Sequence, residues 1–147
     1  MADFLTALTI SGSGLSAQRT RVTVAASNLA NAESTRGPDG QPYRRRDPVL
    51  AAKSFDGELN HASSQPGDAA AAAGVEVTAI VEDPTEGRKV YLPGHPDADP
   101  NGFVTFPNVN PVNETVNLMT ASRGYEANAT AVDTLKTMAT RALDIAR

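Results

Sequence analysis

Residues 4–32, with the sequence FLTALTISGSGLSAQRTRVTVAASNLANA, decide the fold that we expect for this chain. Within this stretch, Leu8, Leu15, Val22 and Leu29 recur every seven residues. A seven-residue apolar repeat is typical of the seam of a coiled coil or of an elongated helix pair. The pattern therefore predicts one long helix over nearly the whole stretch, with one side to be covered by another helix.

The other end of the chain carries a second apolar stripe. Its residues follow the same spacing of three and four: Leu118, Ala121, Tyr125, Val132, Leu135, Ala139, Ala142 and Ala146. The spacing predicts a helix from about Val112 to Ala146 that runs antiparallel to the first, with Leu15 placed near Leu135. Short runs of this kind also occur in compact helical bundles, so the spacing alone leaves that alternative open.

Between the two helices, the sequence predicts a small β-rich insertion with turns at its Gly and Pro residues. Alternating Val residues over 75–82 predict a strand, and we expect residues 88–92 to pair with it as a hairpin. Residues 42–54 predict a strand or an extended arm, and Pro48 would confine a strand to a sheet edge because it has no backbone N–H to donate. A further short strand is predicted at Phe103–Phe106.

The low-complexity stretch 56–74 predicts a flexible loop. The chain is therefore expected to divide into an N-terminal helical region (1–36), the insertion (37–111) and a C-terminal helical region (112–147). The predicted fold is mostly α with a small β insertion. Its long N- and C-terminal helices pair as an elongated antiparallel coiled coil.

The composition favours a building block over a compact enzyme. The 147 residues contain 5% aromatics, and much of the 40% hydrophobic content is alanine, so few large side chains are available for a globular core. Helices of the predicted lengths extend about 45–50 Å, whereas a compact domain of this chain length is about 38 Å across. A single helix pair would leave much apolar surface in water, and we expect several copies or partners to bury it.

The net charge of −4 is concentrated in the middle of the chain, where residues 37–112 hold six basic and eleven acidic side chains. An acidic surface is a poor nucleic-acid interface, because phosphate contacts need clustered Lys and Arg. The sequence has no cysteine, which excludes disulfides and thiolate metal sites. We also expect neither a cleaved signal peptide nor direct membrane insertion, since no continuous apolar stretch is long enough.

No motif predicts catalysis or a cofactor. The order of Asp97, Asp99 and Gly102 reproduces the opening of a calcium-binding loop, but Asn108 stands where the bidentate Glu is required. We therefore expect a turn that is stabilised by side-chain-to-backbone hydrogen bonds. The two histidines of the chain both lie in predicted loops and have no neighbouring nucleophile pattern.

Two terminal segments resemble the signatures of the flagellar axial proteins, which build the rod and hook of the bacterial flagellum. The segments are SGLSAQRTRVTVAASNLANAEST at residues 13–35 and NLMTASRGYEANATAVDTLKTMATRAL at residues 117–143. Two further segments are similar to the proximal-rod members of that family: PYRRRDPVL at residues 42–50 and GHPDADPNGFVTFPNVNPVNE at residues 94–114. The resemblance covers both ends of the chain and does not include residues 56–74.

The resemblance implies a structural function, as a subunit that assembles helically in the proximal rod of the flagellar basal body and transmits torque. It implies export through the flagellar type III apparatus without a cleaved signal peptide, and a location in the periplasm. The implied partners are other flagellar rod proteins, further copies of this chain, and membrane-ring and adaptor subunits. It implies no cofactor. The alternative function is a non-polymerising helical module that recognises a partner helix.

The residues that we expect in the assembly seam are Leu8, Leu15, Val22, Leu29, Leu118, Tyr125, Val132 and Leu135. The family signature contributes the polar residues Gln18, Arg21, Asn28, Asn31, Arg123 and Asn128. The two Asn residues near the end of the first helix either terminate it or tie its exit to the C-terminal helix or a neighbouring chain. The tyrosine of the seam is either a core aromatic or an inter-subunit anchor. The sequence also predicts a basic patch that would bind an acidic surface of a neighbouring subunit. It consists of Arg44, Arg45 and Arg46.

Overall fold

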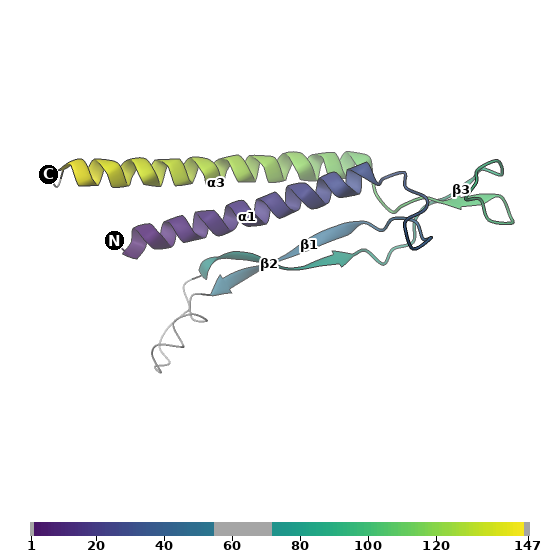
Figure 1. Ribbon diagram of the computed structural model, residues 1–147, viewed down its shortest axis with the longest axis horizontal. Coiled ribbons are helices and arrows are strands. Elements are labelled where there is room, and N and C mark those ends of the chain that lie inside the picture. The colour runs from purple at the N-terminus through teal and green to yellow at the C-terminus, as the bar shows by residue number, and fades with distance from the viewer. Residues whose placement is uncertain (1, 55–71, 146–147) are drawn as a thin grey trace, which may run out of the picture. The chain divides into compact units, whose positions relative to one another are not determined.

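The computed structural model describes residues 2–54 and 72–145, and two long helices dominate it (Figure 1). Helix α1 spans Ala2–Ala30 and helix α3 spans Pro111–Ile145. Four strands lie between them in the sequence and form two small two-stranded sheets. The prediction of a mostly helical fold with little β-structure is confirmed.

The ends of both helices follow from local side-chain chemistry. Asn110 caps α3, because its Oδ1 accepts a hydrogen bond from Val112 N at 3.0 Å, and Pro111 occupies the first helical position, where no N–H is needed. At the end of α1, Asn31 Nδ2 donates to the Ser27 carbonyl at 2.9 Å. The same carbonyl also accepts from Asn31 N at 3.1 Å, so both donors of this residue hold the last turn of the helix.

The sheets pair differently from the predicted hairpin. Strands β1 (Arg46–Ser54) and β2 (Ala72–Glu82) pair with each other. Strands β3 (Lys89–Tyr91) and β4 (Phe103–Thr105) pair antiparallel, with Val90 opposite Val104. The hairpin that we predicted between residues 75–82 and 88–92 is therefore wrong.

The physical reason for this pairing lies at the end of β2. Asp83 N donates to the Arg45 carbonyl at 2.8 Å, so hydrogen bonding between the β1 and β2 segments continues past the last residue of β2. Residues 89–91 pair instead with residues 103–105, so the turn after β2 does not fold the chain back onto β2. The two predicted strands at 42–54 and 103–106 are confirmed with slightly shorter bounds.

Part of the predicted loop 56–74 lies outside the described residues, as do His61 and Ala146. The last three residues of that loop belong instead to β2, which begins at Ala72. Within the described part of the chain, neither helix carries an apolar run sufficient to cross a bilayer.

The contacts between residues divide the chain into two compact units. Unit 1 consists of Met1–Thr20, Leu50–Thr78 and Ser122–Arg147, and unit 2 consists of Arg21–Val49 and Ala79–Ala121. Each unit contains part of both helices. The division into two helical regions and an insertion, drawn from the sequence, stays a prediction.

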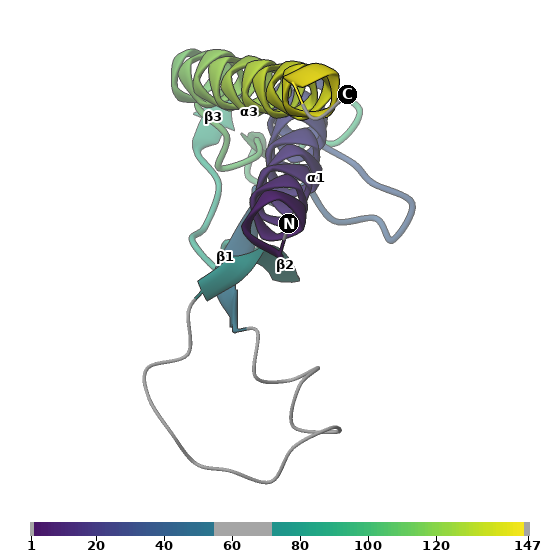
Figure 2. The same ribbon diagram turned by 90° about the vertical axis from the view of Figure 1, so that its left-hand side faces the viewer.

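In unit 1, α1 and α3 approach closely where each helix has a glycine. A Cβ placed on Gly14 would lie 3.0 Å from both amide atoms of Asn128, and one on Gly124 would lie 2.9 Å from Gln18 Cδ. Each glycine thus leaves room for a polar side chain of the other helix. Gly14 lies opposite Asn128, and Gln18 lies opposite Gly124, so the residue number rises along α1 while it falls along α3. The two helices are therefore antiparallel in this stretch (Figure 2).

This contact corrects the predicted register. With Gly14 opposite Asn128, Leu15 lies opposite residue 127 rather than Leu135, a difference of about eight residues or 12 Å along the helix. The apolar spacing could not distinguish the two alignments, because it marks the covered face of each helix and not the residues that lie opposite one another.

A pair of introduced cysteines tests the register. Since a Cβ on Gly14 would lie 3.1 Å from Asn128 Cγ, we expect the double variant Gly14→Cys/Asn128→Cys to form an intrachain disulfide on mild oxidation. The chain has no other cysteine to compete. The matched pair Leu15→Cys/Leu135→Cys should stay reduced within one chain. Non-reducing electrophoresis and mass spectrometry of the monomer measure both, and crosslinking of the second pair alone would contradict the register.

Candidate functional site

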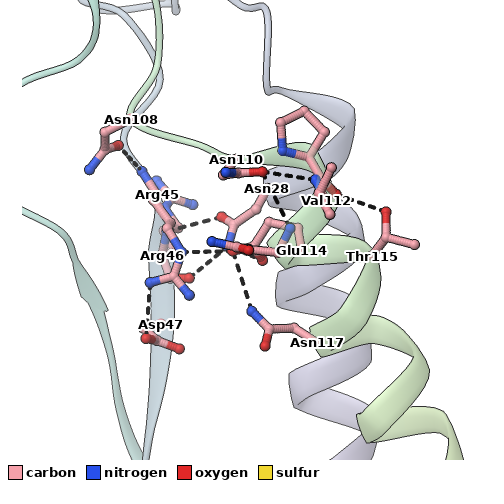
Figure 3. A network of polar contacts seen from close by, with 12 residues as sticks. Asn28, Arg45, Arg46, Asp47, Asn108, Asn110, Val112, Glu114, Thr115 and Asn117 are labelled. Carbon is pink, nitrogen blue, oxygen red and sulfur yellow. Dashed lines mark hydrogen bonds and ion pairs between the residues drawn. The ribbon is translucent and has the colours of Figure 1, made fainter.

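Unit 2 contains a buried polar network that joins α1, α3 and the start of β1 (Figure 3). Its two central side chains are Asn28 and Glu114, which are 0% and 1% exposed. Full burial of polar side chains is stable only when their hydrogen-bonding atoms have partners. The stability of the network therefore depends on the hydrogen-bond partners of these two residues.

Asn28 uses its whole amide. Its Oδ1 accepts from Arg46 N at 3.0 Å and from the Tyr43 hydroxyl at 2.9 Å, while its Nδ2 donates to the Arg46 carbonyl at 2.8 Å and to Glu114 Oε2 at 3.1 Å. The amide thus pairs with the Arg46 backbone as a neighbouring strand would. One side chain of α1 consequently holds both the first residue of β1 and the first turns of α3.

Glu114 joins the same network from α3. Its Oε1 accepts from Arg45 Nε at 2.7 Å, and Arg45 Nη1 lies 3.0 Å from Asp47 Oδ2. The hydrogen bond to Glu114 is the largest cause that raises the pKa of the Arg45 guanidinium further above its ordinary value. The carboxylate also lies near the N-terminus of α3, where the helix dipole favours negative charge.

The backbone of the arginine run is also fixed. Arg45 N donates to Asn108 Oδ1 at 2.9 Å, and Tyr43 N donates to the Ser34 carbonyl at 3.2 Å. Arg46 extends its guanidinium to Glu82 at 2.9 Å and lies 5.7 Å from the centre of the Tyr43 ring. The connection between α1 and β1 is therefore held by side chains and backbone together.

A second polar contact in unit 2 joins the loop after α1 to the loop between β3 and β4. The Thr35 hydroxyl donates to Asp97 Oδ2 at 2.8 Å, and Arg36 Nη1 lies 3.4 Å from Asp97 Oδ1. The hydrogen bond from Thr35, with a smaller contribution from Arg36, lowers the pKa of the Asp97 carboxyl. This carboxylate is engaged in holding two loops together.

The calcium-like sequence forms a turn. Asp99 Oδ1 accepts hydrogen bonds from Asn101 N and Phe103 N, both at 2.9 Å, and Gly102 adopts a φ of 80°, which suits glycine. The second carboxylate of that motif thus closes its own loop, and the first, Asp97, accepts from Thr35. Over residues 2–54 and 72–145, no group of three or more His, Asp or Glu side chains is arranged to hold a metal ion.

The predicted seam residues lie beside the observed helix contact. Leu15 follows Gly14 by one residue, which is about 100° around the helix. Most members of the set are half-buried and Tyr125 is 41% exposed. The small residues Ala17, Ala25 and Ala121 are buried instead. The role of the seam residues in assembly stays a prediction.

The structure places four of the six signature residues at contacts between or within the helices. Asn28 reaches α3 and β1, Asn31 bonds within the end of α1, and Gln18 and Asn128 face glycines on the opposite helix. Arg21 lines a polar cavity of about 260 Å³ beside Asn28 and Glu114. Arg123 is exposed.

Sequence reasoning missed Glu114 and an apolar face of α3. The Glu114 contact depends on residues 28 and 45, which no sequence spacing relates to residue 114. The exposed apolar face consists of Val112, Val116 and Met119, at 71%, 56% and 51% exposure. Their i, i+4, i+7 spacing is the signal that could have revealed it.

Chemically, the network can stabilise a junction but cannot carry out a reaction. Its acidic and basic groups are bonded to one another, and Asn28 has no hydrogen-bonding atom left for a ligand. What the site provides is a rigid connection between two helices and a strand.

Comparison with protein families matches both ends of the chain. A profile described as "Flagella basal body rod protein" matches residues 8–38. A profile described as "Flagellar basal body rod FlgEFG protein C-terminal" matches residues 101–145. The two matches include residues 8–30 of α1 and the whole of α3. They contain Asn28, Asn108 and Glu114 of the buried network but not Tyr43, Arg45, Arg46 and Asp47.

Individual relatives match over nearly their full lengths. The flagellar basal-body rod protein FlgC of Salmonella typhimurium is 44% identical over 136 residues, covering 92% of each chain. FlgC of Bacillus subtilis is 43% identical over 146 residues, covering 95% of this chain and 96% of the relative. FlgC of Borreliella burgdorferi is 38% identical over 144 residues, with 94% of each chain covered.

Proposed function

This chain belongs to the family of flagellar basal-body rod proteins, and from that premise we propose how its surfaces serve assembly. Its function is structural: it is a subunit of the proximal rod of the flagellar basal body and not an enzyme. The alternative of a non-polymerising helical module is not favoured by relatives that are themselves rod proteins.

The observation that carries the assembly proposal is the shortage of buried apolar side chains. Among the residues whose burial is described, the buried apolar ones are Ala17, Val24, Ala25, Val104 and Ala121. Large apolar side chains on both helices remain exposed, including Leu5, Met138 and Leu143. Burying such side chains contributes roughly 1.5–3 kcal/mol each, and neighbouring subunits supply the surface that this chain lacks.

In this proposal, α1 and α3 pair as an antiparallel coiled coil, and the half-buried seam residues beside their contact meet helices of other subunits. The exposed face of Val112, Val116 and Met119 extends that surface on α3. The buried network of Asn28 and Glu114 keeps the junction with β1 rigid, so that torque is transmitted with little deformation.

The finer predictions that rest on the family resemblance belong to the same proposal. They are a location in the periplasm, export through the flagellar type III apparatus without a cleaved signal peptide, and contacts with ring and adaptor subunits. Contacts with other rod proteins and with further copies of this chain follow from the family itself.

A charge placed on the exposed apolar face tests the assembly proposal. In a motile bacterium that lacks its own FlgC, we expect the wild-type chain to restore swimming and the variant Val116→Asp/Met119→Asp to fail. The isolated variant should fold normally, because both side chains are exposed and surface changes usually shift stability by less than about 0.5 kcal/mol. In the rod, the added charges would be buried without partners, which is strongly unfavourable.

The double variant Thr115→Asp/Thr120→Asp provides the matched control, since it adds the same two charges at exposed polar positions on the same helix. It should swim nearly as the wild type. Circular dichroism of the purified chains verifies folding, and swim-plate diameters measure function. Normal swimming of Val116→Asp/Met119→Asp would show that this face does not enter the assembly.

A further inference from the structure

The three consecutive arginines of the chain have different surroundings. Arg45 is bonded to Glu114 and Asp47, and Arg46 is bonded to Glu82. Arg44 is exposed, and within residues 2–54 and 72–145 its side chain has no hydrogen bond or ion pair. The basic patch predicted from the sequence is therefore reduced to one arginine that its own chain does not neutralise.

Arg44 lies at a cavity of about 220 Å³ in unit 2, which the β3–β4 region also lines. Lys89 adds a second cation, and Thr85 and Thr105 add hydroxyl groups. One acidic side chain, Glu86, is on the same lining, but it is 89% exposed and its carboxylate lies 4.0 Å from Lys89 Nζ. It therefore leaves Arg44 uncompensated.

Asn108 provides an independent sign that this cavity needs an acceptor. Its Oδ1 accepts from Arg45 N, whereas its Nδ2 is buried and has no hydrogen-bond partner in the described structure. A buried donor left without an acceptor costs about 1–3 kcal/mol. Asn108 lines the same cavity as Arg44, so this donor without a partner belongs to a residue of the cavity wall, although Asn108 also lines a second cavity beside Asn110.

We propose that this cavity receives the carboxylate of an Asp or Glu side chain from a neighbouring rod subunit. A guanidinium offers two parallel donors to a carboxylate, and Lys89 and the Thr105 hydroxyl add further donors, whereas the Thr85 hydroxyl is bonded to Asp83. The size of the cavity fits one acidic side chain, and the acidic composition of this chain's own middle region makes such side chains abundant on its copies. The inference rests on the structural function proposed above and names the chemistry of one of its contacts.

Competition for incorporation tests the proposal. A tagged variant and the untagged wild-type chain are expressed together, and their ratio in purified basal bodies is compared with their ratio in whole cells by mass spectrometry. We expect Arg44→Glu to be depleted about tenfold or more, because it places like charges together at an interface. Lys89→Glu should be depleted in the same direction, and Arg44→Lys should be depleted less than Arg44→Glu.

Lys53→Glu is the matched control, because it reverses an exposed charge on β1 outside the lining of the cavity and should incorporate normally. Purified Arg44→Glu should keep the thermal midpoint of the wild type. Normal incorporation of Arg44→Glu would overturn the proposal. A large loss of thermal stability in the purified variant would also overturn it, because Arg44 would then act within its own chain. Absence of the wild-type chain from basal bodies would instead contradict the proposed function.

Second-site revertants identify the other half of the contact. Swimming revertants of Arg44→Glu are expected to replace an Asp or Glu of a neighbouring subunit by a neutral or basic residue. Revertants confined to Glu86 would place the charge interaction inside this chain and overturn the proposal.

Discussion

Replacing Asn28 by Ala is expected to lower the free energy of unfolding by roughly 3–5 kcal/mol. The substitution removes four hydrogen bonds and leaves the Arg46 N–H and carbonyl, the Tyr43 hydroxyl and Glu114 Oε2 without their partner. All four groups lie around a side chain that is 0% exposed, so water cannot fully replace the amide without opening the site. Since small domains have a total stability of about 5–15 kcal/mol, the loss would be a large part of it.

The measurement is urea unfolding of the purified chain, followed by circular dichroism, with the midpoint and slope compared between variants. Asn31→Ala is the matched control. It removes the same amide three residues further along the chain, where the side chain is half-buried and bonds to Ser27 and Ser34 near the end of its own helix. We expect that control to cost about 1 kcal/mol or less. Equal costs for the two variants would contradict the special position of Asn28.

The second large effect is expected at Glu114. Glu114 is 1% exposed and accepts from Arg45, from Asn28 and, at 3.5 Å, from Asn117, so Glu114→Ala leaves three donors without this acceptor. Breaking a buried ion pair by removing one partner typically costs 3–5 kcal/mol. Because the Arg45 side chain is 23% exposed and keeps Asp47 as a partner, we expect about 2–4 kcal/mol here.

Glu114→Gln separates charge from shape. The glutamine fills the same volume and its carbonyl can accept from Arg45, but its NH₂ group would face the Asn28 Nδ2 donor. We expect an intermediate loss, smaller than that of Glu114→Ala. A double-mutant cycle with Arg45→Ala gives the coupling between the two side chains. A coupling near zero would show that Glu114 acts through Asn28 alone.

The ion pair between Arg45 and Glu114 also changes the role that we predicted for Arg45 in the basic patch. Charge reversal at Arg45 would oppose Glu114 directly, so its first consequence is a disrupted junction within the chain rather than a weakened contact between subunits. An assembly defect of an Arg45 variant is therefore ambiguous. Arg44, whose side chain has no partner among the described residues, is the position at which inter-subunit charge can be tested separately.

The helices were accessible from sequence because their signals are local. Apolar spacing located α1 and α3, and Asn110-Pro111 and Asn31 mark helix ends through contacts within a few residues. The same locality explains the error in the sheets. Alternating residues identify a strand, but they do not say which other strand it joins, and β2 joined β1 across a long interval of sequence.

The sequence by itself determined the period of the helices, the polar and acidic character of the middle, and the family signatures at both ends. Only the tertiary structure decided the helix register, the strand partners and the pairing of Asn28, Arg45 and Glu114. The physical reason is that an apolar stripe marks the covered face of a helix along its whole length, so small features had to choose the alignment. In unit 1 those features are the two glycines that accommodate Asn128 and Gln18. A buried polar group likewise needs particular partners in space, and no spacing along one strand or helix specifies them.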